Sequence, residues 1–104
     1  GAIEDLNKAI ENGSRPADAF VFRAVAYRLL DKLELALAEI ERALAFRPDH
    51  PDGLLERGIL RRMRNNDDGA RQDWLNIIRL APKSTAADVA RRQLESMDVK
   101  QVPK

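Results

Sequence analysis

Residues 17–50 read ADAFVFRAVAYRLLDKLELALAEIERALAFRPDH, and this stretch decides the fold of the 104-residue chain. In its first half, Phe20, Ala24 and Tyr27 follow one another at spacings of four and three residues. Side chains at these spacings share one face of an α-helix. The first half therefore predicts a helix near 17–30.

The second half of the stretch continues the helical period after a short break. Its apolar residues fall on one side of a helix, namely Leu33, Ala36, Leu37, Ile40, Ala43 and Leu44. Asp31 followed by Glu34 is typical of a capping box, and Pro48 stops the helix because residues before proline avoid the helical region. We therefore expect a second helix near 32–46, joined to the first by a tight turn.

The same pattern recurs along the chain with a fixed period. Residues of matching type are spaced by 34 positions: Ala2, Ala36 and Ala70; Leu6, Ile40 and Trp74; Ala9, Ala43 and Ile77; Ala24 and Gly58; Pro48 and Pro82. A fixed period at which each position keeps its chemical type is an internal repeat.

Helix signals extend the pattern on both sides of this stretch. Further helices are predicted near 2–12, 51–64, 67–80 and 85–97, and no strand is predicted. Asp49 is the expected N-cap of the helix near 51–64. Ser84 or Thr85 is the expected N-cap of the helix near 85–97.

The period and the helix–turn–helix unit resemble tetratricopeptide repeats. One unit supplies the family's spaced pattern as Phe20, Ala24, Tyr27, Ala36, Ile40, Ala43 and Pro48; the next supplies Leu54, Gly58, Ala70, Trp74, Ile77 and Pro82. The resemblance implies an all-α fold, a right-handed superhelix of antiparallel helix hairpins. It also implies about two and a half units plus a C-terminal capping helix.

The resemblance covers residues 1 to about 97 and suggests the domain boundaries. These are the second helix of a truncated unit at 1–16, full units at 17–50 and 51–84, a capping helix at 85–97 and a loose tail at 98–104. Four positions depart from the family pattern. Arg61 replaces an aromatic residue, and Asp31 and Asn65 replace the glycine between paired helices. Ser14 replaces the proline of the first unit, and Pro16 follows two residues late.

In this family, the first helix of each pair lines a concave groove where partner peptides bind. The resemblance thus implies a non-catalytic protein–protein interaction module, with another protein's peptide or amphipathic helix as its partner. The matching groove residues are Val21, Val25, Arg28, Leu29, Leu55, Ile59, Arg62 and Met63. Two arginines between apolar walls suit a segment with an acidic group. Packing of these side chains against adjacent helices is the alternative.

Some family members hold a peptide's terminal carboxylate with lysine and asparagine on this surface. The matching positions here are apolar or acidic: Val21, Phe22, Val25, Asp52, Leu55 and Glu56. We therefore expect no carboxylate clamp of that type.

The helix near 2–12 raises an alternative, structural role. Its apolar face consists of Ile3, Leu6 and Ile10. Leaving such side chains exposed would forfeit roughly 1.5 to 3 kcal/mol each. We expect a cover, either upstream repeats of a longer parent protein, which we favour, or a second copy of the chain in a homodimer.

An arginine cluster suggests nucleic-acid binding as a further, less favoured alternative. It consists of Arg57, Arg61, Arg62, Arg64 and Arg71. On a helix these residues spread over several faces, no aromatic residue is interleaved for base stacking, and acidic residues lie nearby. A solvated face with ion pairs is the favoured interpretation.

Catalysis, metals and cofactors are not expected. The chain has no cysteine and one histidine, His50, which lies in a connecting turn where solvent contact or a helix start explains it. No apolar run is long enough to span a membrane. A net charge of +1 creates no general attraction to nucleic acid or lipid. The compartment stays open; the cytoplasm is slightly favoured, and Gly1 is compatible with a removed signal peptide.

Overall fold

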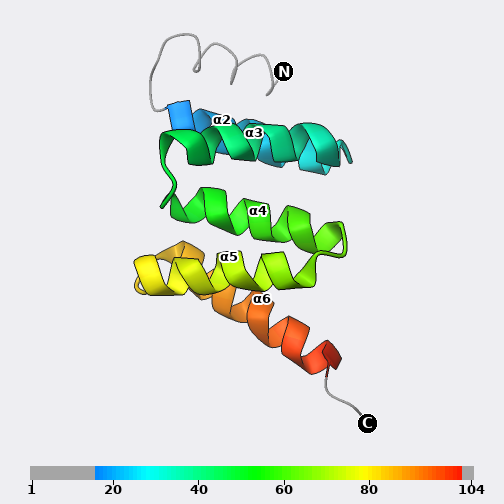
Figure 1. The fold of residues 1–104 in the computed structure, drawn as a ribbon, viewed down its shortest axis with the longest axis vertical. Helices are drawn as coiled ribbons and strands as arrows, with labels where there is room; N and C mark the ends of the chain where they lie inside the picture. The colour runs from blue at the N-terminus through cyan, green and yellow to red at the C-terminus, as the bar shows by residue number, and fades with distance from the viewer. Residues whose placement is uncertain (1–15, 102–104) are drawn as a thin grey trace.

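The computed structural model describes residues 16–101, with side chains as far as Asp98, and these residues form five helices (Figure 1). The helices are α2 (Pro16–Leu29), α3 (Leu33–Phe46), α4 (Pro51–Met63), α5 (Asp67–Leu80) and α6 (Thr85–Gln101). No strand occurs in this part of the chain, which confirms the all-α prediction. The expected helix near 2–12, with Ile3, Leu6 and Ile10, lies outside the described residues.

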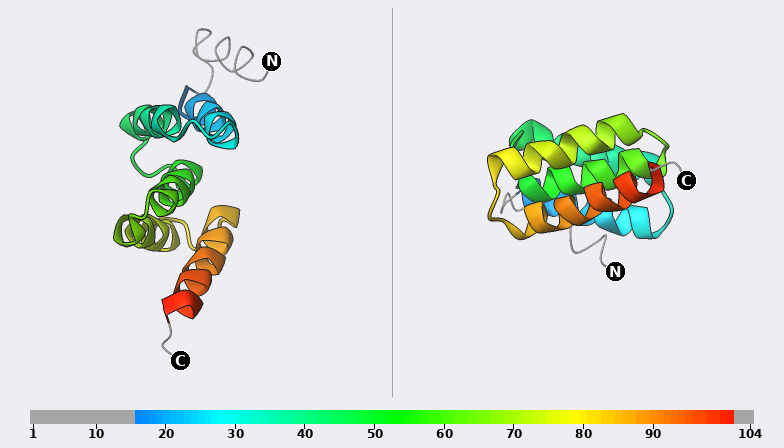
Figure 2. Two further views of the ribbon diagram at one scale, coloured as in Figure 1. Left: turned by 90° about the vertical axis from the view of Figure 1, so that its right-hand side faces the viewer. Right: turned by 90° about the horizontal axis from the view of Figure 1, so that it is seen from below.

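The helices stack as antiparallel hairpins. Helix α2 pairs with α3, and α4 pairs with α5, while α6 packs against both α4 and α5. The leading helices also contact one another, α2 with α4 and α4 with α6. Figure 2 shows the consequence: α2, α4 and α6 lie along one side of the stack, and α3 and α5 lie along the other.

Both turns within the hairpins are closed by a residue in the left-handed backbone region. Asp31 has φ of 62° and Asn65 has φ of 66°. The Lys32 N–H donates to the Tyr27 carbonyl at 2.8 Å, and the Asp31 N–H donates to the Arg28 carbonyl at 2.9 Å. This is the Schellman pattern that usually uses glycine, and aspartate and asparagine tolerate it well. The departures from glycine at these two positions therefore preserve the turn.

The left-handed backbone at Asp31 also corrects a sequence-based expectation. The predicted capping box at Asp31 and Glu34 is wrong, because a residue with positive φ belongs to the preceding helix end. Lys32 is the N-cap of α3 instead, and its side chain makes no capping hydrogen bond.

Side chains do cap the later helices. The N-cap of α4 is His50 rather than the expected Asp49; its Nδ1 accepts a hydrogen bond from the Gly53 N–H at 3.0 Å. Asn66 caps α5. Ser84 Oγ accepts from the Ala87 N–H at 3.0 Å, so Ser84, one of the two expected candidates, performs this role for α6.

Helix α6 is longer than the sequence suggested. It continues to Gln101, whereas we expected it to end near 97 and a loose tail to begin at Asp98. No proline or glycine interrupts the chain between Thr85 and Gln101. Without a helix breaker, the backbone hydrogen bonds propagate through the polar end of the segment.

The core lies between the paired helices and depends on one very close approach. Trp74 of α5 is fully buried. A Cβ atom added to Gly58 of α4 would lie 2.3 Å from Trp74 Nε1 and 2.7 Å from Cε2. The indole N–H donates to the Leu55 carbonyl at 3.3 Å, which holds the ring in place. At the equivalent positions of the preceding hairpin, Ala24 is matched with the smaller Ile40.

We expect Gly58→Ala to destabilise the chain by about 1 to 3 kcal/mol, because the methyl group overlaps the indole ring. This loss would occur although alanine is the better helix former by about 1 kcal/mol. In a Trp74→Phe background, the smaller ring should leave room for the methyl group, and the added loss should fall by at least half. Urea unfolding of the two single variants and the double variant measures this coupling. Equal losses in the two backgrounds would contradict it.

Candidate functional site

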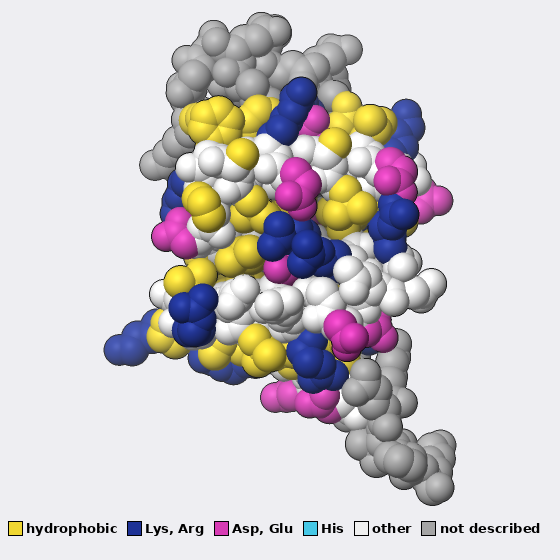
Figure 3. Space-filling model, viewed as in Figure 1, with side chains coloured by type: hydrophobic (Ala, Val, Ile, Leu, Met, Phe, Trp, Pro, Cys, Tyr) yellow, Lys and Arg dark blue, Asp and Glu magenta, His cyan; other side chains and the backbone are white. Residues whose placement is uncertain are grey.

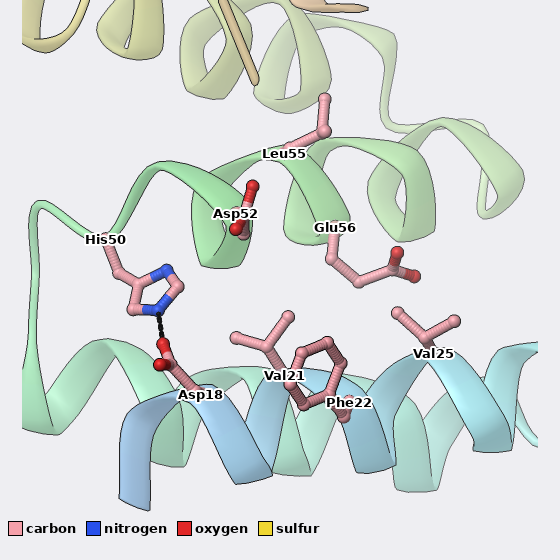
Figure 4. A pocket seen from close by; sticks show the side chains of 8 residues that line it. All are labelled: Asp18, Val21, Phe22, Val25, His50, Asp52, Leu55 and Glu56. Carbon is pink, nitrogen blue, oxygen red and sulfur yellow. Dashed lines mark hydrogen bonds and ion pairs between the residues drawn. The ribbon is translucent and has the colours of Figure 1, made fainter. Parts of the chain in front are cut away.

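A cavity of about 280 Å³ opens between α2 and α4, which we call the α2–α4 pocket (Figure 4). Helix α2 contributes one wall and α4, with its N-cap residue, contributes the other. The lining residues are Asp18, Val21, Phe22, Val25, His50, Asp52, Leu55 and Glu56. Four of these eight side chains are apolar, three are carboxylates and one is His50.

The pocket is built from equivalent positions of two successive repeats. Asp18 and Asp52 are 34 residues apart, as are Val21 and Leu55. Equivalent positions on stacked leading helices face the same side of the stack, so the repeat brings them together. The recurring aspartate was a usable signal in the sequence, although Asp18 and His50 were not recognised as site residues from it.

His50 joins the two walls at one end of the pocket (Figure 4). The side chain is buried, with 4% of its surface exposed. Its Nδ1 accepts from the Gly53 N–H, so the ring proton lies on Nε2 and is donated to Asp18 Oδ1 at 2.6 Å. The prediction that His50 starts a helix is confirmed. The prediction that its side chain contacts solvent is wrong, because Asp18 and the α4 backbone form hydrogen bonds with both ring nitrogens.

Arg28 joins the walls at the other end. Its Nε donates to Glu56 Oε2 at 2.5 Å, and its Nη2 donates to Oε1 at 3.3 Å. Only 4% of the Glu56 surface is exposed. Burial raises the pKa of Glu56, and the hydrogen bond and positive charge of Arg28 offset part of that rise. The ion pair with Arg28 therefore offsets part of the free-energy cost of removing the Glu56 carboxylate from water.

The structure divides the predicted groove residues between two places. Val21, Val25 and Leu55 line the α2–α4 pocket. The other predicted members lie outside its lining: Arg28, Leu29, Ile59, Arg62 and Met63. Of these, Ile59 packs against the core, and Leu29 and Met63 are exposed at the C-terminal ends of α2 and α4.

The two arginines of the predicted groove are engaged within the chain. Arg28 binds Glu56, as described above, and Arg62 donates to Gln93 Oε1 at 3.0 Å and to Ser96 Oγ at 3.4 Å. Each arginine thus connects its own leading helix to the next one. Since both guanidinium groups already have partners, they no longer provide a reason to expect an acidic group in the partner.

The remaining members of the arginine cluster also form ion pairs. Arg57 and Arg61 both contact the fully buried Asp73, at 2.9 and 3.0 Å. The hydrogen bond that Arg57 donates to Asp73 is the main reason that the pKa of Arg57 is raised. Arg64 pairs with Glu34, and Arg71 pairs with Asp98. Figure 3 shows basic and acidic side chains next to each other over the face that carries α3 and α5.

One of these pairs repeats with the period of the chain. The ion pair of Arg23 with Glu39 in the first hairpin corresponds to that of Arg57 with Asp73 in the second. Each pair connects the two helices of its own hairpin. These arginines therefore serve packing between helices.

Residues 16–98 contain no group of three or more histidine, cysteine, aspartate or glutamate side chains placed to hold a metal ion. In the same part of the chain, no helix has the length and apolar character required to cross a bilayer.

Comparisons with known proteins identify the class. No family model matches the chain. The chain is 35% identical over 97 residues to tetratricopeptide repeat protein 36 of Bos taurus, a match that covers 89% of this chain and 49% of that protein. It therefore spans about half the length of the curated relative that it matches.

Solved structures share the fold at lower identity. The TPR domain of Arabidopsis OM64 superposes with a TM-score of 0.75 at 22% identity, covering 91% of this chain and 78% of that one. The first TPR of Spaghetti (RPAP3), bound to the HSP90 peptide SRMEEVD, gives 0.64 at 20% identity, with coverages of 93% and 90%. The first TPR domain of human RPAP3 gives 0.65 at 20% identity, with coverages of 96% and 92%.

The relative's name and these superpositions agree with the repeat observed in the sequence and with the stacked hairpins. The resemblance to the tetratricopeptide-repeat family is thereby confirmed. The described helices share the stacked-hairpin fold of these tetratricopeptide-repeat domains.

The raised pKa of Glu56 has a consequence for stability. The ordinary pKa of a glutamate is 4.5, and the raised pKa means that the folded chain holds the carboxyl proton of Glu56 more tightly than the unfolded chain does. The stabilising contribution of Glu56 therefore grows as the pH falls through the raised pKa, and it is fully present below pH 4.5. At neutral pH the buried charge lowers stability, and Arg28 limits this loss.

We expect Arg28→Met to lower the free energy of unfolding by about 2 kcal/mol at neutral pH, because it leaves a buried carboxylate without its cation. The deficit should shrink as the pH approaches 4.5, since a protonated Glu56 needs no cation. Urea unfolding at a series of pH values measures both effects. Arg79→Met is the control, because Arg79 is exposed and donates only to the neutral Asn76. A deficit for Arg28→Met that does not change with pH would contradict the role of Glu56.

Proposed function

We propose that the chain is a non-catalytic protein–protein interaction module whose α2–α4 face binds a segment of a partner protein. The segment is a peptide or an amphipathic helix, and its contacts include Val25 and Leu55 in the pocket and Leu29 and Met63 beyond it. The observation that carries the proposal is the open, partly apolar cavity between the two leading helices.

The character of the pocket supports a protein partner. Clefts that hold drug-sized molecules have volumes of roughly 300 to 1,000 Å³, and this one, at about 280 Å³, is smaller and suits one or two side chains. Phe22 borders it with 62% of its surface exposed. Covering such a ring with a partner would remove apolar area from water, which is the main driving force of association.

A structural neighbour supports the same type of function. The first TPR of Spaghetti (RPAP3) was solved with an HSP90 peptide. At 20% identity that likeness extends to the fold, so the peptide itself is not transferred to this chain. The positions where relatives hold a peptide carboxylate with lysine and asparagine are apolar or acidic here, and all six line the α2–α4 pocket. The proposed partner is therefore a different kind of segment.

Selection from a random peptide library displayed on phage tests the proposal. We expect the selected peptides to lose affinity for the double variant Phe22→Ala and Val25→Ala by at least about tenfold, because two apolar contacts are removed. Fluorescence anisotropy with labelled peptides measures the affinity.

The matched control is Leu75→Ala, which removes an exposed apolar side chain on α5, outside the pocket. It should leave the affinity unchanged, and circular dichroism should show that all variants stay folded. Peptides that bind the double variant as tightly as the original chain would place the site elsewhere. Failure to select any peptide would count against the proposal as a whole.

A further inference from the structure

We propose that the α2–α4 pocket recognises an arginine side chain of the partner segment. The inference rests on the proposed function and deepens it, since it names the charge and shape of the group that enters the pocket. It reverses the sequence-based expectation of an acidic partner. Its basis is the distribution of charge around the cavity.

The pocket has an excess of negative charge. Three of its eight lining residues are carboxylates, Asp18, Asp52 and Glu56, and none is a lysine or arginine. Arg28 balances only Glu56, because its guanidinium group is directed at that carboxylate through two hydrogen bonds. The two aspartates are therefore left as the charges that a ligand meets.

Both aspartates have free capacity to accept hydrogen bonds. Asp52 is exposed in the first turn of α4 and has no hydrogen bond or ion pair to any described residue. The Asp18 side chain is 34% exposed, and only its Oδ1 is engaged, by His50. An arriving cation can thus bind either carboxylate without breaking a contact of the fold.

The apolar walls favour arginine over lysine. The carbon stem of a long basic side chain packs against apolar surface while its charged end reaches a polar group. Val21, Val25 and Leu55 provide such a surface. A planar guanidinium group stacks on an aromatic ring and donates two parallel hydrogen bonds to a carboxylate, which an ammonium group cannot do in the same way. The exposed ring of Phe22 lines the same cavity as Asp52.

The same charges disfavour an acidic segment. A carboxylate placed in the pocket would approach Asp18 and Asp52 with no free cation among the lining residues. Like charges brought together at an interface cost binding energy and exclude the wrong partner. The pocket therefore selects by charge as well as by shape.

Three synthetic peptide pools test the inference. Each pool has randomised apolar residues on both sides of one fixed residue, which is arginine, citrulline or glutamate. Citrulline keeps the shape of arginine and lacks its charge. We expect the immobilised chain to retain the arginine pool about tenfold more strongly than the citrulline pool, the equivalent of one charge-assisted hydrogen bond. The glutamate pool should be retained least.

Asp52→Asn removes a pocket charge and preserves the size of the side chain. We expect it to remove most of the preference for arginine over citrulline. The matched control is Asp68→Asn, since Asp68 is also exposed and holds the same second position of its helix, α5. Both substitutions remove an acid from a helix N-terminus, so any effect on helix stability should be similar. Only Asp52→Asn should change the selectivity.

The outcomes separate this inference from the proposed function. Equal retention of the arginine and citrulline pools, or preference for glutamate, overturns the inference. So does a preference for arginine that Asp52→Asn leaves unchanged. In each of these cases, retention that still depends on Phe22 and Val25 means that the proposed function stands. If no pool is retained, both are wrong.

Discussion

Each helix hairpin of this chain can bury its apolar side only against a neighbouring hairpin, and the rest of the structure follows from that constraint. The buried residues recur at the 34-residue period because stacked hairpins meet at the same positions each time. Within a hairpin, close pairing of the two helices also requires small residues where they cross, and Gly58 of α4 against Trp74 of α5 is the extreme case. At the equivalent positions of the first hairpin, a slightly larger Ala24 is combined with a smaller Ile40.

The polar contacts obey the same geometry. Arg23 with Glu39 and Arg57 with Asp73 connect the helices within each hairpin, and Arg28 with Glu56 connects successive leading helices. Because these pairs lie partly or fully inside the stack, each buried carboxylate requires its cation. A chain rich in arginine thereby uses most of the described guanidinium groups to hold its own helices together.

That internal use of arginine determines what the open face offers to a partner. The α2–α4 pocket contains two partly open carboxylates: Asp52, which has no partner among the described residues, and Asp18, of which only Oδ1 is engaged, by His50. The specificity of such a surface resides in its side chains and not in the stack of helices.

The helices, their period and the positions of close packing could be predicted from the amino-acid sequence, because these depend on local spacing and on residue size at fixed intervals. It also predicted that Val21, Val25 and Leu55 face the same side of the stack. The folded chain was needed to reveal that His50 caps α4 and donates to Asp18, and that Arg28 and Arg62 are engaged within the chain. These choices join residues about 30 positions apart, and they depend on how the helices are oriented and which rotamers fit between them. Periodicity contains no information about either, so it could not predict which carboxylates of the pocket already have a partner.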